Sequence, residues 1–281
     1  MTPPRLCASA VYQLVFCFPK KLSHISGSIQ LRMSWSLANK KALVTGGTKG
    51  IGKATAQELL DLGAEVLVIA RDTKSIEGKL RHSARLYVMP GDITEASFRH
   101  DLIRKVDENW GKLDILVNNV GSNIRKKFTD YTEDEYRQLF ELNLFSLMEL
   151  TRLAFPMLKN AGHASVVNVA SVAGELDVLS GPPYGMTKAA ILQLSRHLAA
   201  EWAEHGIRVN SVSPWYIETP LTEAVLSQPE RMSKIIERTP LQRVGKPEEV
   251  AAAIAFLAMD KASYITGQNL RVDGGMSVKG L

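Results

Sequence analysis

Short apolar runs alternate with longer amphipathic stretches from residue 41 onward, and this pattern constrains the fold more than any other feature of the sequence. The runs are rich in Val, Ile and Leu on consecutive positions, as expected of strands buried on both faces. They lie at 42–44, 66–70, 86–89, 115–117, 166–169, 209–212 and 269–272. Helical stretches lie between them, at 51–62, 98–109, 133–159 and 187–204. The alternation predicts an α/β fold with a doubly wound parallel sheet in a single domain.

Residues 1–32 differ in composition from the rest of the chain. The 281 residues include 34 basic and 29 acidic ones, a net charge of +5, but residues 1–32 hold four of the basic residues and no acid. The remainder has a net charge of +1, so it gives no electrostatic case for nucleic acid as a partner. Both cysteines also lie in 1–32, so the rest has no disulfide, thiolate metal site or cysteine nucleophile. We predict no metal site.

Three interpretations fit residues 1–32. An apolar stretch over 6–18 after Arg5 weakly resembles a secretion signal, and a basic, acid-free segment is also typical of organelle targeting. The third interpretation is an over-extended reading frame, with Met33 as the true start, and we favour it because the compact pattern begins directly afterwards. We therefore predict a domain over 33–281 in the cytoplasm, with organelle targeting by 1–32 as the alternative. No apolar run is long enough to predict a membrane-spanning helix.

A glycine-rich turn joins the first predicted strand to the first predicted helix. It reads Thr45-Gly46-Gly47-Thr48-Lys49-Gly50-Ile51-Gly52. Glycines there permit a tight turn, close approach of the backbone to a pyrophosphate, and close packing of helix on strand. The free N–H groups of the helix N-terminus favour phosphate binding. In this setting the turn predicts a Rossmann-type dinucleotide site, in which Gly46, Thr48, Lys49, Gly50, Ile51 and Gly52 bind the cofactor.

The end of the second strand distinguishes the two nicotinamide dinucleotides. An acid there would hold the ribose hydroxyl of NAD, whereas a base would accept the 2′-phosphate of NADP. The chain has Arg71 at this place, and Lys49 in the turn is a second basic group. Asp72 lies one position beyond the place of an NAD-selecting acid. These residues predict NADP(H) as the cofactor.

Tyr184 and Lys188 lie four residues apart at the start of a predicted helix, so they share one face. A nearby ammonium favours the phenolate form of tyrosine, which otherwise has a pKa of about 10. Tyr184 could then give a proton to a carbonyl oxygen or take one from an alcohol. Ser171 follows a buried strand, at the end where such sheets bind ligands, and its hydroxyl could stabilise charge on the substrate oxygen. Asn143 is a poor helix former within an apolar helical stretch.

Together these residues resemble the short-chain dehydrogenases/reductases, in their compact single-domain branch, over residues 36–281. Asn143, Ser171, Tyr184 and Lys188 fall where that family has its four catalytic residues. The resemblance implies that Asn143 holds a water linking Lys188 to solvent. It also implies further cofactor contacts by Asp92, Ile93, Asn119, Gly121, Pro214, Ile217 and Thr219. The turn, Ala70-Arg71 and the opening Trp35-Ser36-Leu37 are similar to tropinone-reductase-like members.

The substrate side departs from the family pattern at Trp215, where relatives usually have glycine after Pro214. Either its indole narrows the pocket together with Tyr216, or it packs outward on the following segment. Residues 219–244 are expected to form one or two short helices that cover the site. Glu175 and Leu179, between Ser171 and Tyr184, are predicted to face the substrate. For Glu175 a solvated loop acid is the alternative.

The sequence therefore predicts an NADP(H)-dependent oxidoreductase that transfers a hydride between nicotinamide and a small carbonyl or secondary alcohol. One alternative is a protein that senses NADP or serves as a scaffold without turnover. Another is a reductase of carrier-linked 3-oxoacyl groups, which would use a basic patch such as residues 125–127, although a solvated charged loop also explains that run. The family resemblance implies a homo-oligomer, a tetramer or a dimer.

Overall fold

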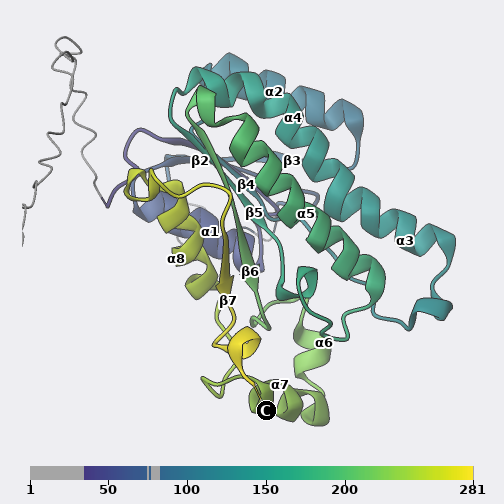
Figure 1. The fold of residues 1–281 in the computed structure, drawn as a ribbon. Coiled ribbons are helices and arrows are strands. Elements are labelled where there is room, and N and C mark those ends of the chain that lie inside the picture. Colours follow the sequence, from purple (N-terminus) through teal and green to yellow (C-terminus); the bar gives the residue numbers. More distant parts are fainter. Residues whose placement is uncertain (1–34, 75, 77–82, 281) are drawn as a thin grey trace, which may run out of the picture. The chain divides into compact units, whose positions relative to one another are not determined.

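The computed structural model describes residues 35–74, 76 and 83–280 (Figure 1). The segment 1–32 lies outside the described residues. Within them, seven parallel strands form a sheet in the order β3-β2-β1-β4-β5-β6-β7. The strands are β1 Lys41–Thr45, β2 Glu65–Ala70, β3 Leu86–Pro90, β4 Ile115–Asn118, β5 Ala164–Val169, β6 Ile207–Pro214 and β7 Asn269–Val272. The predicted doubly wound parallel sheet is confirmed.

Helices cover both faces of this sheet (Figure 1). They are α1 Gly50–Asp61, α2 Ala96–Trp110, α3 Glu133–Phe140, α4 Ser146–Asn160, α5 Pro182–Glu201, α6 Glu223–Leu226, α7 Pro229–Arg238 and α8 Pro247–Ala258. On one face α1 packs beside α8, and on the other lie α2, α4 and α5. The expected short helices between residues 219 and 244 are α6 and α7. No helix in the described part of the chain has the length and apolarity that crossing a membrane requires.

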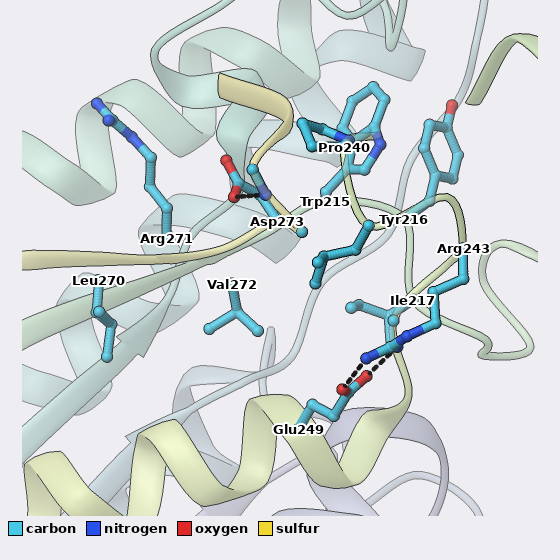
Figure 2. Close-up of a pocket in the computed structure, with 14 residues that line it drawn as sticks. Trp215, Tyr216, Ile217, Pro240, Arg243, Glu249, Leu270, Arg271, Val272 and Asp273 are labelled. Carbon is cyan, nitrogen blue, oxygen red and sulfur yellow. Dashed lines mark hydrogen bonds and ion pairs between the residues drawn. The ribbon is translucent and has the colours of Figure 1, made fainter. Parts of the chain in front are cut away.

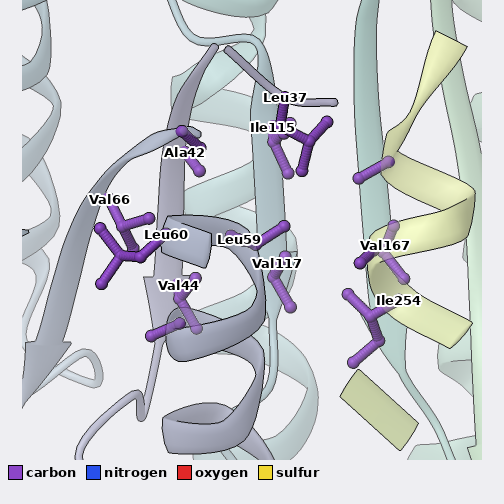
Figure 3. Packing of buried hydrophobic residues seen from close by; sticks show 14 of the residues in the cluster. Leu37, Ala42, Val44, Leu59, Leu60, Val66, Ile115, Val117, Val167 and Ile254 are labelled. Carbon is purple, nitrogen blue, oxygen red and sulfur yellow. The ribbon is translucent and has the colours of Figure 1, made fainter. Parts of the chain in front are cut away.

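The core consists of two apolar layers, one on each face of the sheet. In β1, Ala42 and Val44 point into the layer under α1 and α8, which Figure 3 shows, while Leu43 points into the layer under α2 and α4. All three side chains are fully buried. Side chains of successive strand residues point to opposite faces, so a strand covered on both faces must be apolar at every position. This requirement explains the consecutive apolar runs in the sequence.

The helix predicted over 133–159 is not regular. α3 ends at Phe140, and a π-helical turn over Glu141–Phe145 leads into α4. Asn143 lies in the middle of this turn. A single π-helical turn inserted between α-helices is rare and frequently found at functional sites. The pattern of apolar residues predicts the helical stretch but not the change of helix type.

A chain of buried polar side chains crosses the centre of the sheet. The Asn118 amide on β4 donates to Thr151 Oγ1 on α4 at 3.0 Å and to Asn168 Oδ1 on β5 at 2.8 Å. The Asn168 amide donates to Ser195 Oγ on α5 at 2.9 Å, and the Ser211 hydroxyl on β6 donates to the same oxygen at 2.8 Å. All five residues are buried. These hydrogen bonds therefore join β4, β5 and β6 to two helices. One is α4, which follows the turn that holds Asn143, and the other is α5, which carries Tyr184 and Lys188.

Substitution of Asn168 with leucine tests the importance of this hydrogen-bonded chain. The leucine is similar in size but removes the acceptor of one Asn118 amide N–H and one of the donors to Ser195 Oγ, while Asn118 keeps its bond to Thr151 and Ser195 its bond to Ser211. Because a buried polar group without a partner costs about 1–3 kcal/mol, we expect the free energy of unfolding to fall by about that amount in urea titrations. Asn160→Leu, at an exposed asparagine that ends α4, is the matched control. Equal losses in the two variants would contradict a special role for Asn168.

Candidate functional site

A cavity of about 600 Å³ opens at the carboxyl ends of the strands, where the strand order reverses between β1 and β4. Ligands of doubly wound folds bind at this reversal. The predicted cofactor residues that line the cavity are Gly46, Thr48, Lys49, Gly50, Ile51, Arg71, Asp92, Ile93, Asn119, Gly121, Tyr184, Lys188, Pro214, Ile217 and Thr219. Gly52 lies outside this lining, and a Cβ on it would stand 2.2 Å from the Gly46 carbonyl oxygen. Gly52 therefore serves the close packing of the turn.

The glycine turn has the backbone geometry of a phosphate cradle. Gly46 and Gly50 have φ angles of 66° and 54°, which side-chain-bearing residues rarely adopt. α1 begins at Gly50, so the unpaired N–H groups of its first turn lie beside the cavity. The Asn119 amide donates to the carbonyl oxygens of Thr45 at 2.9 Å and Gly46 at 3.2 Å, which holds the turn against the end of β4. These features fit a dinucleotide pyrophosphate.

Basic side chains lie at the end of the cavity beyond β2. The Arg71 guanidinium is 77% exposed and stands 4.0 Å from the Asp92 carboxylate. Partial burial raises the pKa of Asp92, but hydrogen bonds from Thr94 and the Arg71 charge outweigh this effect and lower it. Asp72 accepts a hydrogen bond from the Lys74 N–H at 2.9 Å, so its carboxylate is engaged in a local turn. The Arg71 and Lys49 side chains remain available to an anion at this end.

Tyr184 and Ser171 meet at the opposite end of the cavity. Tyr184 lies in the first turn of α5, which begins with Pro182, a residue favoured at this position of a helix. Ser171 follows β5 and caps a short 3-10 turn, accepting a hydrogen bond from the Ala173 N–H at 3.2 Å. Loss of solvent around the Tyr184 phenol raises its pKa, and a hydrogen bond with the Ser171 side chain lowers it by less. The phenol therefore holds its proton at neutral pH.

Lys188 is buried one helical turn after Tyr184. Its side chain is 3% exposed and its ammonium donates to the Val169 carbonyl oxygen at 2.8 Å. The Nζ atom lies 5.7 Å from the centre of the Tyr184 ring. Burial lowers the pKa of Lys188 from 10.5 to about 8. A buried ammonium with one partner keeps donors available for a ligand in the cavity, such as a ribose.

Asn143 connects the π-helical turn to the loop after β4. Its Oδ1 atom accepts from the Ser122 N–H at 2.8 Å, and its amide donates to the Ser122 carbonyl oxygen at 2.9 Å. A Cβ on Gly121 would lie 3.4 Å from Asn143 Oδ1 and 3.5 Å from Lys188 Nζ, so both side chains flank this glycine. The predicted residues Asn143, Ser171, Tyr184 and Lys188 therefore come together around one end of the cavity.

Trp215 borders both this cavity and a second one of about 490 Å³, which Figure 2 shows. Its indole N–H donates to Thr239 Oγ1 at 3.2 Å, and its ring meets the Tyr216 ring edge-on at 4.7 Å between centroids. Both rings pack against the apolar cluster of α6 and α7 around Val225 and Ile235. Tyr216 lines the second cavity, and its phenol also raises the pKa of Tyr184. The indole thus packs on the covering helices while bordering the site.

Glu175 and Leu179, predicted to face the substrate, lie outside the lining of both cavities. The Arg271 guanidinium binds both carboxylate oxygens of Glu175 at 2.7 and 3.0 Å, and the Asn269 amide adds a third hydrogen bond. This ion pair lowers the pKa of Glu175 and ties this exposed loop residue to β7. Leu179 has a φ of 55° and is 86% exposed. Because Arg271 is 96 residues away, no local sequence signal reveals its partnership with Glu175.

Comparisons with known proteins agree with this fold. The family model for enoyl-(acyl carrier protein) reductase matches residues 46–277. A tropinone reductase homolog of Arabidopsis thaliana is 46% identical over 251 residues, covering 88% of this chain and 95% of the relative. A chloroplastic tropinone reductase homolog of that plant is 44% identical over 263 residues, covering 92% of this chain and 82% of the relative.

Solved structures of other proteins have a similar fold. A gluconate 5-dehydrogenase from Burkholderia cenocepacia, in complex with NADP and tartrate, has a TM-score of 0.83 and 29% identity, covering 88% of this chain and 98% of that one. The aldohexose dehydrogenase of Thermoplasma acidophilum has a TM-score of 0.79 and 32% identity, covering 87% of this chain and 96% of that one.

The fold and cavity define a dinucleotide-binding α/β protein. The chain belongs to the short-chain dehydrogenase/reductase family, in its tropinone-reductase-like branch, and this membership supports an oxidoreductase activity.

Substitution of Lys188 with methionine tests the cost of its burial. The folded protein holds the Lys188 pKa at about 8, while the unfolded chain keeps the usual 10.5, so charging Lys188 opposes folding below pH 8. We expect the variant to gain up to about 3 kcal/mol in free energy of unfolding at pH 7, less what the lost bond to Val169 contributes. Stability of the wild type should rise between pH 8 and 10.5, and the variant should lack this rise.

Guanidinium chloride titrations at several pH values measure both effects. Lys105→Met, at an exposed lysine on α2, is the control and should change neither quantity. A wild type whose stability does not rise relative to that of Lys188→Met between pH 8 and 10.5 would show that the burial penalty is absent.

Proposed function

We propose that this protein transfers a hydride between NADP(H) and a carbonyl or secondary alcohol carbon, with Tyr184 as the general acid and base. One observation carries the proposal: Tyr184, Ser171 and Lys188 border the same cavity as the glycine turn and Arg71. Such an elongated site suits a dinucleotide with its phosphates at the turn and its reactive ring beside the tyrosine. The NADP bound to the related gluconate 5-dehydrogenase supports the same cofactor here.

The choice of NADP(H) follows from charge at the far end of the cavity. Arg71 and Lys49 would hold the 2′-phosphate, since a guanidinium and an ammonium both bind phosphate oxygens strongly. Asp92 would contact the adenine end, and the local turn that engages Asp72 weakens its competition for a ribose hydroxyl. Asn119, Ile217 and Thr219 would complete the binding site from the loops after β4 and β6.

The proton chemistry follows from the surroundings of Tyr184. In the reducing direction the protonated phenol gives its proton to the substrate oxygen, while the Ser171 hydroxyl stabilises the negative charge that develops there. The Lys188 ammonium then stabilises the phenolate that remains, because an opposite charge nearby favours the charged form. The bound cofactor supplies the hydride. In the oxidising direction the phenolate takes the alcohol proton.

A screen of NADPH oxidation with diverse carbonyl compounds tests the proposal as a whole. Turnover of at least one compound is expected. Tight NADPH binding without turnover of any would instead support a protein that senses NADP.

Tyr184→Phe removes the proton donor and leaves the ring in place. We expect turnover to fall by about 10²- to 10⁴-fold, the usual contribution of a general acid, with nearly unchanged NADPH affinity. Steady-state kinetics and a fluorescence titration with NADPH measure the two quantities. Tyr264→Phe, at a fully exposed tyrosine, is the matched control. Near-normal turnover in the Tyr184 variant would rule this tyrosine out as the acid.

Arg71→Ala removes the proposed 2′-phosphate contact. Loss of one charge-assisted hydrogen bond should raise the KM for NADPH by about tenfold, and the KM for NADH should change much less. The comparison needs both cofactors with one carbonyl substrate. Arg104→Ala, at an exposed arginine on α2, is the control. Similar changes for the two cofactors would mean that Arg71 does not read the phosphate.

A further inference from the structure

The loop after β4 carries a half-buried arginine whose buried nitrogen has no partner. The Nε atom of Arg125 and the Oδ1 atom of Asn123 are shielded from solvent and make no hydrogen bond within the described residues. No carboxylate of the described residues forms an ion pair with the Arg125 guanidinium either. Buried polar groups in folded proteins almost always have partners, so such an atom points to a ligand or water that completes it. Arg125 is therefore not the solvated loop charge that the sequence alternative assumed.

The loop holds Arg125 in a fixed place relative to the catalytic end of the cavity. The backbone N–H of Ser122 donates to the Asn143 side chain, and the Ser122 carbonyl oxygen accepts from the Asn143 amide. The Asn123 amide then donates to the Ser180 carbonyl oxygen at 3.0 Å, four residues before Tyr184. The loop is thus tied both to the π-helical turn and to the entry of α5. A charged group held in this way is pre-organised for binding.

The loop that carries Arg125 reaches the same end of the cavity, because Ser122, three residues earlier, lines it. Burial raises the pKa of the Tyr184 phenol, and the Arg125 charge lowers it in opposition. Its neighbours in the loop do not share this position, because Lys126 pairs with Glu135 and Lys127 is exposed. Arg125 lies outside the lining of the cavity itself, but a substrate whose carbonyl oxygen meets Tyr184 would lie beside the loop that carries it, in addition to the buried Lys188.

We propose that Arg125 binds a carboxylate of the substrate, so that the enzyme prefers carbonyl compounds that carry one carboxylate near the reacting carbon. The inference rests on the proposed function and names its substrate class. A guanidinium matches a carboxylate in a planar, two-bond geometry, and removing both from water strengthens the contact. A phosphate dianion would need more positive charge than this single guanidinium offers.

The test compares 2-oxobutanoate, acetoacetate and levulinate with their methyl esters, which keep the carbonyl and lose the charge. We expect the wild type to favour at least one acid over its ester in kcat/KM for NADPH-dependent reduction. Arg125→Met should lower kcat/KM for that acid by about 10- to 100-fold, chiefly through KM, and change the ester little. Arg125→Lys should fall between the two, since it keeps the charge and loses the planar fork. Lys127→Met, at the exposed lysine of the same loop, should behave as the wild type.

A binding measurement separates this inference from the proposed reaction. In saturating NADP⁺, the preferred acid should raise the melting temperature of the wild type and not that of Arg125→Met. If no compound turns over but an acid still binds in this Arg125-dependent way, the proposed reaction fails and the inference stands. If the esters bind and react as well as the acids, or Arg125→Met weakens acid and ester equally, the inference is overturned and the reaction stands.

Discussion

The buried hydrogen bonds that run from Asn118 through Asn168 to Ser195 hold together the half of the molecule that carries the candidate catalytic residues. Apolar layers pack the helices on the sheet, but apolar contacts alone tolerate sliding of one element on another. A polar chain inside such a core is different, because a shift of one residue would leave several buried groups without partners. The chain therefore fixes the register of α5 against β5. Tyr184 and Lys188 lie on α5, and Ser171 follows β5, so their mutual geometry depends on this register.

The same reasoning explains what could be predicted from the sequence. Strands buried on both faces must be apolar at every position, so the strands, the helices between them and the parallel sheet could be predicted from the apolar runs in the sequence. The candidate catalytic residues could also be proposed from the sequence, because Tyr184 and Lys188 lie on one helix and Ser171 follows a strand. Glu175 was assigned to the substrate because it lies between Ser171 and Tyr184 in sequence. Its actual partner, Arg271, comes from β7, and only the folded sheet brings the two together.

Trp215 shows a different limit of sequence reasoning. The family pattern led us to expect glycine at this place, and with it a backbone conformation that side chains avoid, yet Trp215 is not among the residues with positive φ. The turn therefore accepts a side chain without strain. The indole contacts Tyr216 and Thr239, so the Trp215 side chain lies between the cavity and the helices that cover it. The indole thus packs on the covering helices and also borders the cavity, whereas Tyr216 lines only the second cavity.

Charge is distributed unevenly along the cavity. The acids in its described lining are Asp72 and Asp92, both at the Arg71 end. At the Tyr184 end stands the buried Lys188, and the Arg125 charge lowers the pKa of the phenol. Glu175, in the loop between Ser171 and Tyr184, is neutralised by Arg271. A site that is positive at this end stabilises any negative charge that forms on the substrate oxygen or on the phenolate. Burying Lys188 lowers the stability of the fold, and in the proposed function this ammonium stabilises the phenolate. Charged groups in active sites commonly lower stability in this way.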